Sequence, residues 1–228
     1  MNSATPKVFL PVKGKPLILY TLERFVDVQN VSRVILVLPA KELARCDALI
    51  RTDRALDALR YTLWPGGARR QDSVRQGLNC LDADCEVVIV HDGARPFVRP
   101  ALVDRCVEAA FKDGAAVVGV PARDTIKMVS SDRAVSKTLP REGLWQIQTP
   151  QAFRTEIIRA AYERAEREDI EATDDAMLVE RLQKSVIVLE GDPLNIKVTI
   201  PEDLTLAEML VSGNFHLQID VALGRSPA

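Results

Sequence analysis

An acid and an arginine directly follow a run of apolar β-formers in the segment EVVIVHDGARP, residues 86–96. In open α/β sheets, ligands bind outside the carboxyl ends of the strands. A carboxylate such as Asp92 can hold Mg²⁺, and a guanidinium such as Arg95 can bind phosphate oxygens. The segment therefore indicates a metal-phosphate site, although a surface turn with a local ion pair would use the same residues. His91 is expected to be packed and hydrogen-bonded rather than to act as a base.

A second polar segment, GGARRQDS at residues 66–73, joins an expected strand to an expected helix. Its two glycines leave backbone N–H groups accessible, and the start of the helix carries a partial positive charge that attracts phosphate. Arg69 and Arg70 add full positive charges. The segment fits a phosphate group or a base that is read by the backbone, but a tight turn with solvated arginines would look the same.

Other polar positions are ambiguous when each is taken alone. Lys7 and Lys197 both have the pattern of solvated surface lysines, although Lys197 lies between apolar neighbours. Thr173 is expected to cap a helix whose first turn carries two acids. Trp145 is expected to be a buried aromatic residue, and Gln148–Gln151 is expected to be a turn.

Strands and helices alternate along the first half of the chain, which predicts a mainly parallel, doubly wound, Rossmann-like α/β sheet. The strand at residues 87–90 is expected to be buried on both faces. The expected strands are 34–38, 61–64, 87–90 and 115–120, and the expected helices are 16–26, 41–50, 71–81 and 100–112.

The alternation stops between residues 121 and 150, where two short β-like runs, 125–129 and 134–139, flank a polar turn. This pattern predicts an inserted β-hairpin arm at about 122–142. Because an isolated hairpin is marginal in water, the arm is expected to lie on a second subunit, or else to fold back on its own sheet. The later expected elements are helices 153–168, 174–182 and 201–210 and a strand at 186–189, so residues 1–211 are interpreted as one domain and 212–228 as a tail.

The composition is that of a globular protein, with 47% apolar and 27% charged residues among 228 and a formal net charge of −2. This charge gives no reason to expect nucleic acid or an anionic membrane as a partner, so a polyanionic ligand must be held by locally gathered Lys and Arg. No apolar run approaches the ~20 residues of a membrane span. Four cysteines without a CxxC pair argue against structural zinc and for a reduced, cytoplasmic protein.

Taken together, the motifs resemble those of the 2-C-methyl-D-erythritol 4-phosphate cytidylyltransferase family of the non-mevalonate isoprenoid pathway. The resemblance runs from about Thr5 to Leu210. It implies transfer of a cytidylyl group from CTP to a sugar-alcohol phosphate, with release of pyrophosphate, help from Mg²⁺, and a homodimer formed through the arm. The matching segments, in chain order, are PKVFLPVKGKPL, GGARRQDSV, VIVHDGARP, RDTIK, LWQIQTPQAF, ATDDA and NIKVTIPEDL.

The resemblance also implies a role for individual residues. Two lysines would stabilise charge on the transferred phosphates, namely Lys7 and Lys197. Asp92 would bind Mg²⁺ and lie near the acceptor. The residues of the expected nucleotide loop are Gly67, Ala68, Arg70 and Ser73. Those expected at the acceptor are Arg95, Thr125, Arg141, Thr149 and Thr173.

Two departures from the family pattern bear on these expectations. A strand and a glycine-rich loop ending in arginine precede Pro6-Lys7 in the family, whereas no GxG occurs in this sequence. A sheet without that central strand is expected to expose unpaired backbone. Ala68 replaces an acid, so base contact there is expected through the backbone. Three alternatives stay open: a ribitol 5-phosphate cytidylyltransferase, a truncated homologue with little or no activity, and the first half of a fusion with a later pathway enzyme.

Overall fold

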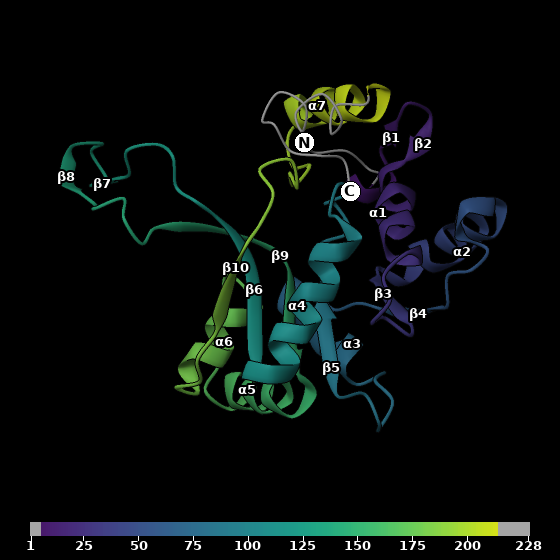
Figure 1. Cartoon of the computed structure of the whole chain (residues 1–228), viewed down its shortest axis with the longest axis horizontal. Helices are drawn as coiled ribbons and strands as arrows, with labels where there is room; N and C mark the ends of the chain where they lie inside the picture. The colour runs from purple at the N-terminus through teal and green to yellow at the C-terminus, as the bar shows by residue number, and fades with distance from the viewer. Residues whose placement is uncertain (1–5, 214–228) are drawn as a thin grey trace.

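Runs of apolar, mostly β-branched residues form the central sheet of the computed structural model, which describes residues 6–213. The sheet has the strand order β10-β6-β9-β5 and consists of β5 (Val87–Val90), β6 (Ala115–Pro121), β9 (Trp145–Arg154) and β10 (Ile187–Glu190). β10 is parallel to β6, whereas β9 is antiparallel to both β6 and β5. The sheet is therefore mixed rather than mainly parallel, because β9 returns from the arm into the middle of the sheet (Figure 1).

Helices cover both faces of this sheet, and β6 shows how its alternating side chains meet them. Ala115 and Val117 pack into the cluster that contains α5 and α6 residues, whereas Ala116 and Val118 pack into the cluster of α4. The α/β class, with helices on both faces, is thus confirmed. The three helices are α4 (Pro100–Asp113), α5 (Thr155–Arg167) and α6 (Asp175–Arg181).

A second, two-stranded sheet pairs β3 (Val34–Leu38) in parallel with β4 (Tyr61–Pro65). Leu22 of α1 and Cys46 of α2 share a buried cluster with Leu36 of β3, so these two helices pack on the small sheet. The neighbouring elements are η1 (Lys7–Phe9), β1 (Pro11–Val12), β2 (Lys15–Pro16), α1 (Leu17–Val26), η2 (Ala40–Glu42), α2 (Leu43–Thr52) and η3 (Arg54–Leu56).

Two further helices join the parts of the molecule. α3 (Arg70–Leu78) follows β4 and contributes Leu78 to the cluster beneath α5. α7 (Pro201–Ser212) buries Ala207 against Val12 and Leu17. Most of the expected tail, residues 214–228, lies outside the described residues. Within residues 6–213, no helix is both long and apolar enough to cross a membrane.

A groove separates the two sheets, because β3 and β5 are not hydrogen-bonded to each other. It has a volume of about 370 Å³ and is lined along its length by both strands, with Val8, Leu22 and Val74 among its apolar walls. Within residues 6–213, β3 and β5 therefore each present an unpaired edge to the groove, and exposed unpaired backbone was expected. The prediction that the 87–90 strand is buried on both faces was wrong: all four residues are only half-buried, because the groove leaves one side of β5 uncovered.

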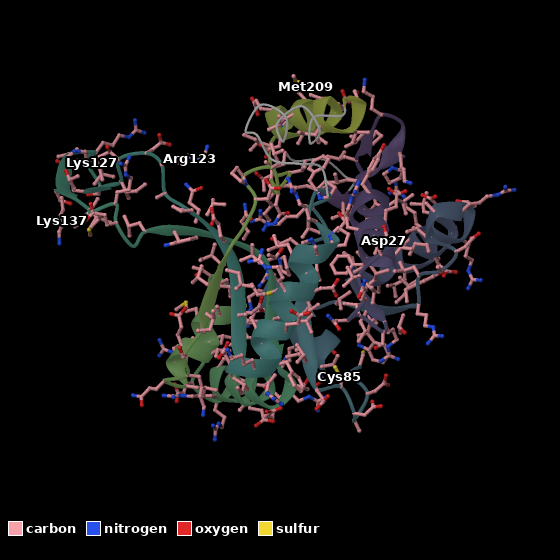
Figure 2. All side chains as sticks on the ribbon, in the orientation of Figure 1. Asp27, Cys85, Arg123, Lys127, Lys137 and Met209 are labelled. Atoms are coloured by element: carbon pink, nitrogen blue, oxygen red, sulfur yellow. The ribbon has the colours of Figure 1, made fainter. Side chains whose placement is uncertain are left out.

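The predicted hairpin is present as β7 (Lys127–Val129) paired antiparallel with β8 (Val135–Thr138). Every residue of both strands is exposed. The hairpin projects from the body on long connections, and Figure 2 shows Lys127 and Lys137 far from the central sheet (Figures 1 and 2). The alternative in which the hairpin folds back on its own sheet was therefore wrong.

The segment after the arm was misjudged from its polar residues. Gln148–Gln151 is not a turn but the buried middle of β9, and Trp145 at the start of that strand is 39% exposed rather than buried. The buried Gln148, Thr149 and Gln151 are tolerated because each forms hydrogen bonds with distant parts of the chain. The bond between Thr149 and Asp92 places the middle of β9 beside the residues that follow β5.

Candidate active site

Three cations converge on Asp92, just beyond the carboxyl end of β5. Lys197 Nζ lies 2.8 Å from Asp92 Oδ2, and Arg95 Nε lies 3.7 Å from the same oxygen. Arg70 Nε lies 3.5 Å from Oδ1. The side chain of Asp92 is 14% exposed, so the carboxylate is accessible but mostly surrounded by protein.

The charges around Asp92 favour an anionic ligand. Burial alone would raise the pKa of Asp92, but the hydrogen bond and charge of Lys197, with the charges of Arg70 and Arg95, hold it below its ordinary value. The carboxylate is therefore ionised at neutral pH and is outnumbered by cations. Because the net charge of the chain is close to zero, a polyanionic ligand was expected to need a local cluster of Lys and Arg, and these three residues form such a cluster.

The loop before α7 delivers Lys197 to this cluster. Val198 is buried and its N–H donates to Ala94 O at 2.9 Å, which joins the loop to the segment after β5. Asn195 is fully buried, donates to Thr149 O at 2.9 Å, and accepts a 2.7 Å bond at its own carbonyl from Arg95 Nη1. Lys197 is thus fixed at its backbone, and its side chain, although 42% exposed as expected for a surface lysine, is paired with Asp92.

His91 and Thr149 fix the backbone at Asp92. Thr149 Oγ1 accepts a 3.1 Å bond from Asp92 N and lies 3.1 Å from His91 Nδ1. His91 Nε2 lies 3.2 Å from Arg95 O, which can only accept, so Nε2 carries the proton and Nδ1 accepts from Thr149. The ring also packs edge-on against Phe25. His91 is therefore the packed, hydrogen-bonded residue that was predicted.

The glycine loop between β4 and α3 forms a tight turn over the start of the helix. Ser73 Oγ accepts a 3.2 Å bond from Gly67 N, and Asp72 Oδ2 accepts a 3.0 Å bond from Arg69 N. A Cβ on Gly67 would lie 2.3 Å from Asp72 Cβ, so only glycine fits there. Arg69 pairs with Asp72, which leaves Arg70, the first residue of α3, as the arginine that reaches Asp92.

Asp175 and Tyr162, which were not among the expected site residues, lie behind Arg70. Arg70 Nη2 donates to Asp175 Oδ2 at 2.7 Å, and Tyr162 Oη donates to Asp175 Oδ1. Asp175 was read only as an acid at a helix start, and Tyr162 fits the apolar face of α5. Neither has a sequence signal that links it to Arg70, because the three residues come from three separate helices.

The expected acceptor residues are only partly brought together. Arg95 and Thr149 are in the cluster, but the Thr149 hydroxyl is engaged with His91 and Asp92. Thr125 and Arg141 lie on the arm, where Arg141 Nη1 donates to Arg123 O at 2.7 Å. Thr173 is exposed, and it does not cap α6 as predicted.

Asp174, rather than Thr173, caps α6. Its Oδ1 accepts a 3.0 Å bond from Met177 N, because the helix starts one residue later than expected.

Two other expected site residues lie at the surface. Lys7 is exposed in η1 and is not among the cations that contact Asp92. Ala68 is exposed in the glycine loop, beside the start of α3.

Comparison with known proteins agrees with this geometry. The family model for 2-C-methyl-D-erythritol 4-phosphate cytidylyltransferase matches residues 1–213. A relative with that name from Syntrophus aciditrophicus is 43% identical over 208 residues, which are 91% of this chain and 88% of the relative. One from Caldanaerobacter subterraneus is 39% identical over 92% of each chain.

Solved structures show the same likeness in three dimensions. The 2-C-methyl-D-erythritol 4-phosphate cytidylyltransferase of Thermus thermophilus superimposes with a TM-score of 0.76 at 38% identity, over 91% of this chain and 94% of that one. The 4-diphosphocytidyl-2C-methyl-D-erythritol synthase of Anaerococcus prevotii gives a TM-score of 0.81 at 29% identity, over 89% and 88%. The chain with its cationic cluster at Asp92 thus belongs to the 2-C-methyl-D-erythritol 4-phosphate cytidylyltransferase family of nucleotidyltransferases.

Proposed function

We propose that this protein transfers a cytidylyl group from CTP to 2-C-methyl-D-erythritol 4-phosphate, with release of pyrophosphate, in the synthesis of isoprenoid precursors. The observation that carries the proposal is the convergence of Lys197, Arg70 and Arg95 on Asp92 in a chain of this family.

The four cysteines are free, which supports a reducing, cytoplasmic location.

The reaction needs positioning and charge stabilisation more than acid–base chemistry. An oxygen of the acceptor phosphate attacks the α-phosphorus of CTP in line, and the bond to pyrophosphate breaks. The attacking group is already an anion, so no general base or covalent intermediate is required. Lys197 and Arg70 would stabilise the negative charge that develops on the phosphoryl oxygens, and Lys7 would add to this stabilisation.

The glycine loop is proposed to hold the nucleotide. Gly67 allows close approach of a ligand to the backbone, and the start of α3 beside it offers a partial positive charge to a phosphate. Ala68 has no side-chain donor or acceptor, so its contact with cytosine would be made by the backbone. Ser73 keeps the loop closed through its bond with Gly67 N.

Asp92 fits a divalent cation that is shared with the substrate. Among residues 6–213, no group of three or more His, Cys, Asp and Glu could hold a metal by itself. Mg²⁺ is usually bound by one or two carboxylates together with substrate phosphates, and the single accessible carboxylate of Asp92 suits that arrangement. When bound, the ion would neutralise charge on the triphosphate.

The arm supports a homodimer with a shared acceptor site. Met128, Val129 and Val135 are 51%, 59% and 60% exposed, which is unusual for apolar residues of a hairpin in water. A second copy of this chain would cover them. Thr125 and Arg141 flank the β7–β8 hairpin, which projects from the body of its own chain (Figure 1), so they would complete the acceptor site of the partner.

Turnover with two acceptors tests the proposal. The purified protein is incubated with CTP, Mg²⁺ and either 2-C-methyl-D-erythritol 4-phosphate or ribitol 5-phosphate, and products are followed by phosphorus NMR. We expect pyrophosphate and a cytidine diphosphate conjugate with the methylerythritol phosphate. Exclusive use of ribitol 5-phosphate would overturn the choice of acceptor. A folded protein that turns over neither acceptor would show that this chain is not an active cytidylyltransferase.

A further inference from the structure

The carboxylate of Asp175 is a buried charge with a different donor on each oxygen. Its side chain is 1% exposed. Arg70 Nη2 donates to Oδ2 at 2.7 Å, and Tyr162 Oη donates to Oδ1. A charge that is buried without partners is very costly, so the carboxylate and its two donors hold one another in place.

Asp175 itself cannot shift easily, because the start of α6 is fastened to β9. Gln151 Nε2 donates to Asp174 Oδ2 at 2.9 Å, and Gln151 Oε1 accepts from Ala176 N at 3.1 Å. Gln151 is only 2% exposed. One amide side chain thus bonds the residues on both sides of Asp175, and the carboxylate has a fixed position behind the polar cluster.

The two bonds to Asp175 fix the plane of its carboxylate. Each carboxylate oxygen can accept more than one hydrogen bond, so the Tyr162 hydroxyl does not exclude Arg70 from Oδ1. With Tyr162 on Oδ1 and Arg70 on Oδ2, however, the carboxylate cannot rotate without breaking a bond. Since the guanidinium is planar and rigid, an anchor at Nη2 alone keeps Nε directed at Asp92 Oδ1, 3.5 Å away.

We propose that Tyr162 is a positioning residue, which keeps Arg70 shared between Asp175 and Asp92 by fixing the carboxylate of Asp175 that anchors the arginine. Without the hydroxyl, the Asp175 carboxylate is free to rotate, and the Nε of Arg70 withdraws from Asp92 and from the phosphates that would bind there. The effect on catalysis rests on the proposed function, whereas the effect on the position of Arg70 does not.

The chain contains a matched control for the variant Tyr162→Phe. Tyr61 Oη donates to Asp47 Oδ1 at 2.7 Å, and Arg51 Nε donates to Asp47 Oδ2 at 2.7 Å. The two oxygens of this aspartate likewise accept from a tyrosine and an arginine, but the group is more exposed and lies on α2 and β4. Tyr61→Phe therefore removes a tyrosine–aspartate bond without changing a residue of the candidate site.

Kinetics and a double-mutant cycle test the proposal. We expect Tyr162→Phe to lower kcat/KM for CTP about tenfold, the scale of changes in residues that support a site's ligands, and Tyr61→Phe to leave it unchanged. Adding Tyr162→Phe to Arg70→Ala should cause no further loss, because the hydroxyl acts through Arg70. Equal effects of the two Tyr→Phe variants, or additive losses in the cycle, would overturn the proposal.

Crystal structures of the wild type and the Tyr162→Phe variant give a readout that does not need turnover. The proposal expects a rotated Asp175 carboxylate in the variant, and a longer distance between Arg70 Nε and Asp92 Oδ1. An unmoved Arg70 would refute it even if the protein proves inactive. If Tyr162→Phe does not fold, Asp175→Asn replaces it, since loss of the anchoring charge should also displace Arg70 from Asp92.

Discussion

Lys197 Nζ lies 2.8 Å from Asp92 Oδ2, so the loop before α7 closes onto the carboxyl end of β5. Lys197 is also the leading cause, after burial, of the shifted pKa of Asp92, and it opposes the effect of burial. Its side chain is 42% exposed, which leaves the ammonium group accessible to a ligand. One contact thus serves both to keep the carboxylate ionised and to present a cation to phosphate.

Removal of the Lys197 charge should impair turnover. Lys197→Met is expected to lower kcat by at least ~10²-fold, the scale for loss of one electrostatic stabiliser. The pKa of Asp92 should rise at the same time, so the acidic limb of the pH–rate profile should move to higher pH. Pyrophosphate release measures both effects. Lys184→Met, at an exposed lysine near β10, is the control, and equal rates for the two variants would contradict the assignment.

Loss of the Asp92 carboxylate should separate binding from turnover. Asp92→Ala is expected to lower kcat by at least ~10²-fold. The same change removes the anion from among three cations, so pyrophosphate should bind more tightly in the absence of Mg²⁺. Calorimetry measures the binding. Weaker binding of pyrophosphate by the variant would show that the cationic cluster does not hold the anion.

Lys7 stays a prediction from the family resemblance, and a substitution can decide it. Lys7→Ala is expected to lower turnover by at least ~10²-fold, because a lysine that neutralises the triphosphate acts mainly in the transition state. Lys13→Ala, at an exposed lysine in the nearby β1–β2 turn, should have no effect. Near-normal turnover by Lys7→Ala would remove this residue from the catalytic set.

His91 should make the fold sensitive to acid. Desolvation by the surrounding protein lowers its pKa from 6.5 to about 4, so between these values the unfolded chain binds a proton that the folded chain does not. Stability is then complete above pH 6.5 and falls with the pH, by about 3 kcal/mol at pH 4. Urea unfolding of the wild type and of His91→Gln at several pH values measures the difference. Parallel pH dependences would contradict the prediction.

The apolar arm should control assembly. Val129→Asp with Val135→Asp is expected to convert a homodimer to monomers, because two charges would replace side chains that are 59% and 60% exposed in the single chain. Light scattering after size-exclusion chromatography gives the mass. Met209→Asp, on α7 at the top of Figure 2 rather than on the arm, and 57% exposed, is the control. A wild-type monomer would refute the dimer.

Local patterns in the sequence were sufficient for the elements that depend on local physics. α4 follows from its apolar periodicity, its first-turn Pro100 and the Gly114 that ends it with a φ of 95°. The acid and arginine of the VIVHDGARP segment were recognised because both lie in one turn. These signals involve residues that are close in the chain, so the helix and the strand end can be predicted from the local sequence alone.

Long-range partnership explains what could not be predicted. β9 was missed because Gln148 and Gln151 look like turn residues until their partners Asp192 and Asp174 are known. Lys197 looked like a surface charge for the same reason, since Asp92 lies in a distant segment. A buried polar residue is stable only with its hydrogen-bond partner, and a single sequence does not show that partner.

The groove between β3 and β5 divides the candidate site between two independently paired sheets. The glycine loop follows β4 of the small sheet, whereas Asp92 follows β5 of the large one. No backbone ladder ties β3 to β5, so the distance between nucleotide loop and Asp92 depends on side-chain packing and on the Arg70 contact. A ligand that contacts both the glycine loop and Asp92 would therefore span the groove and join the two sheets.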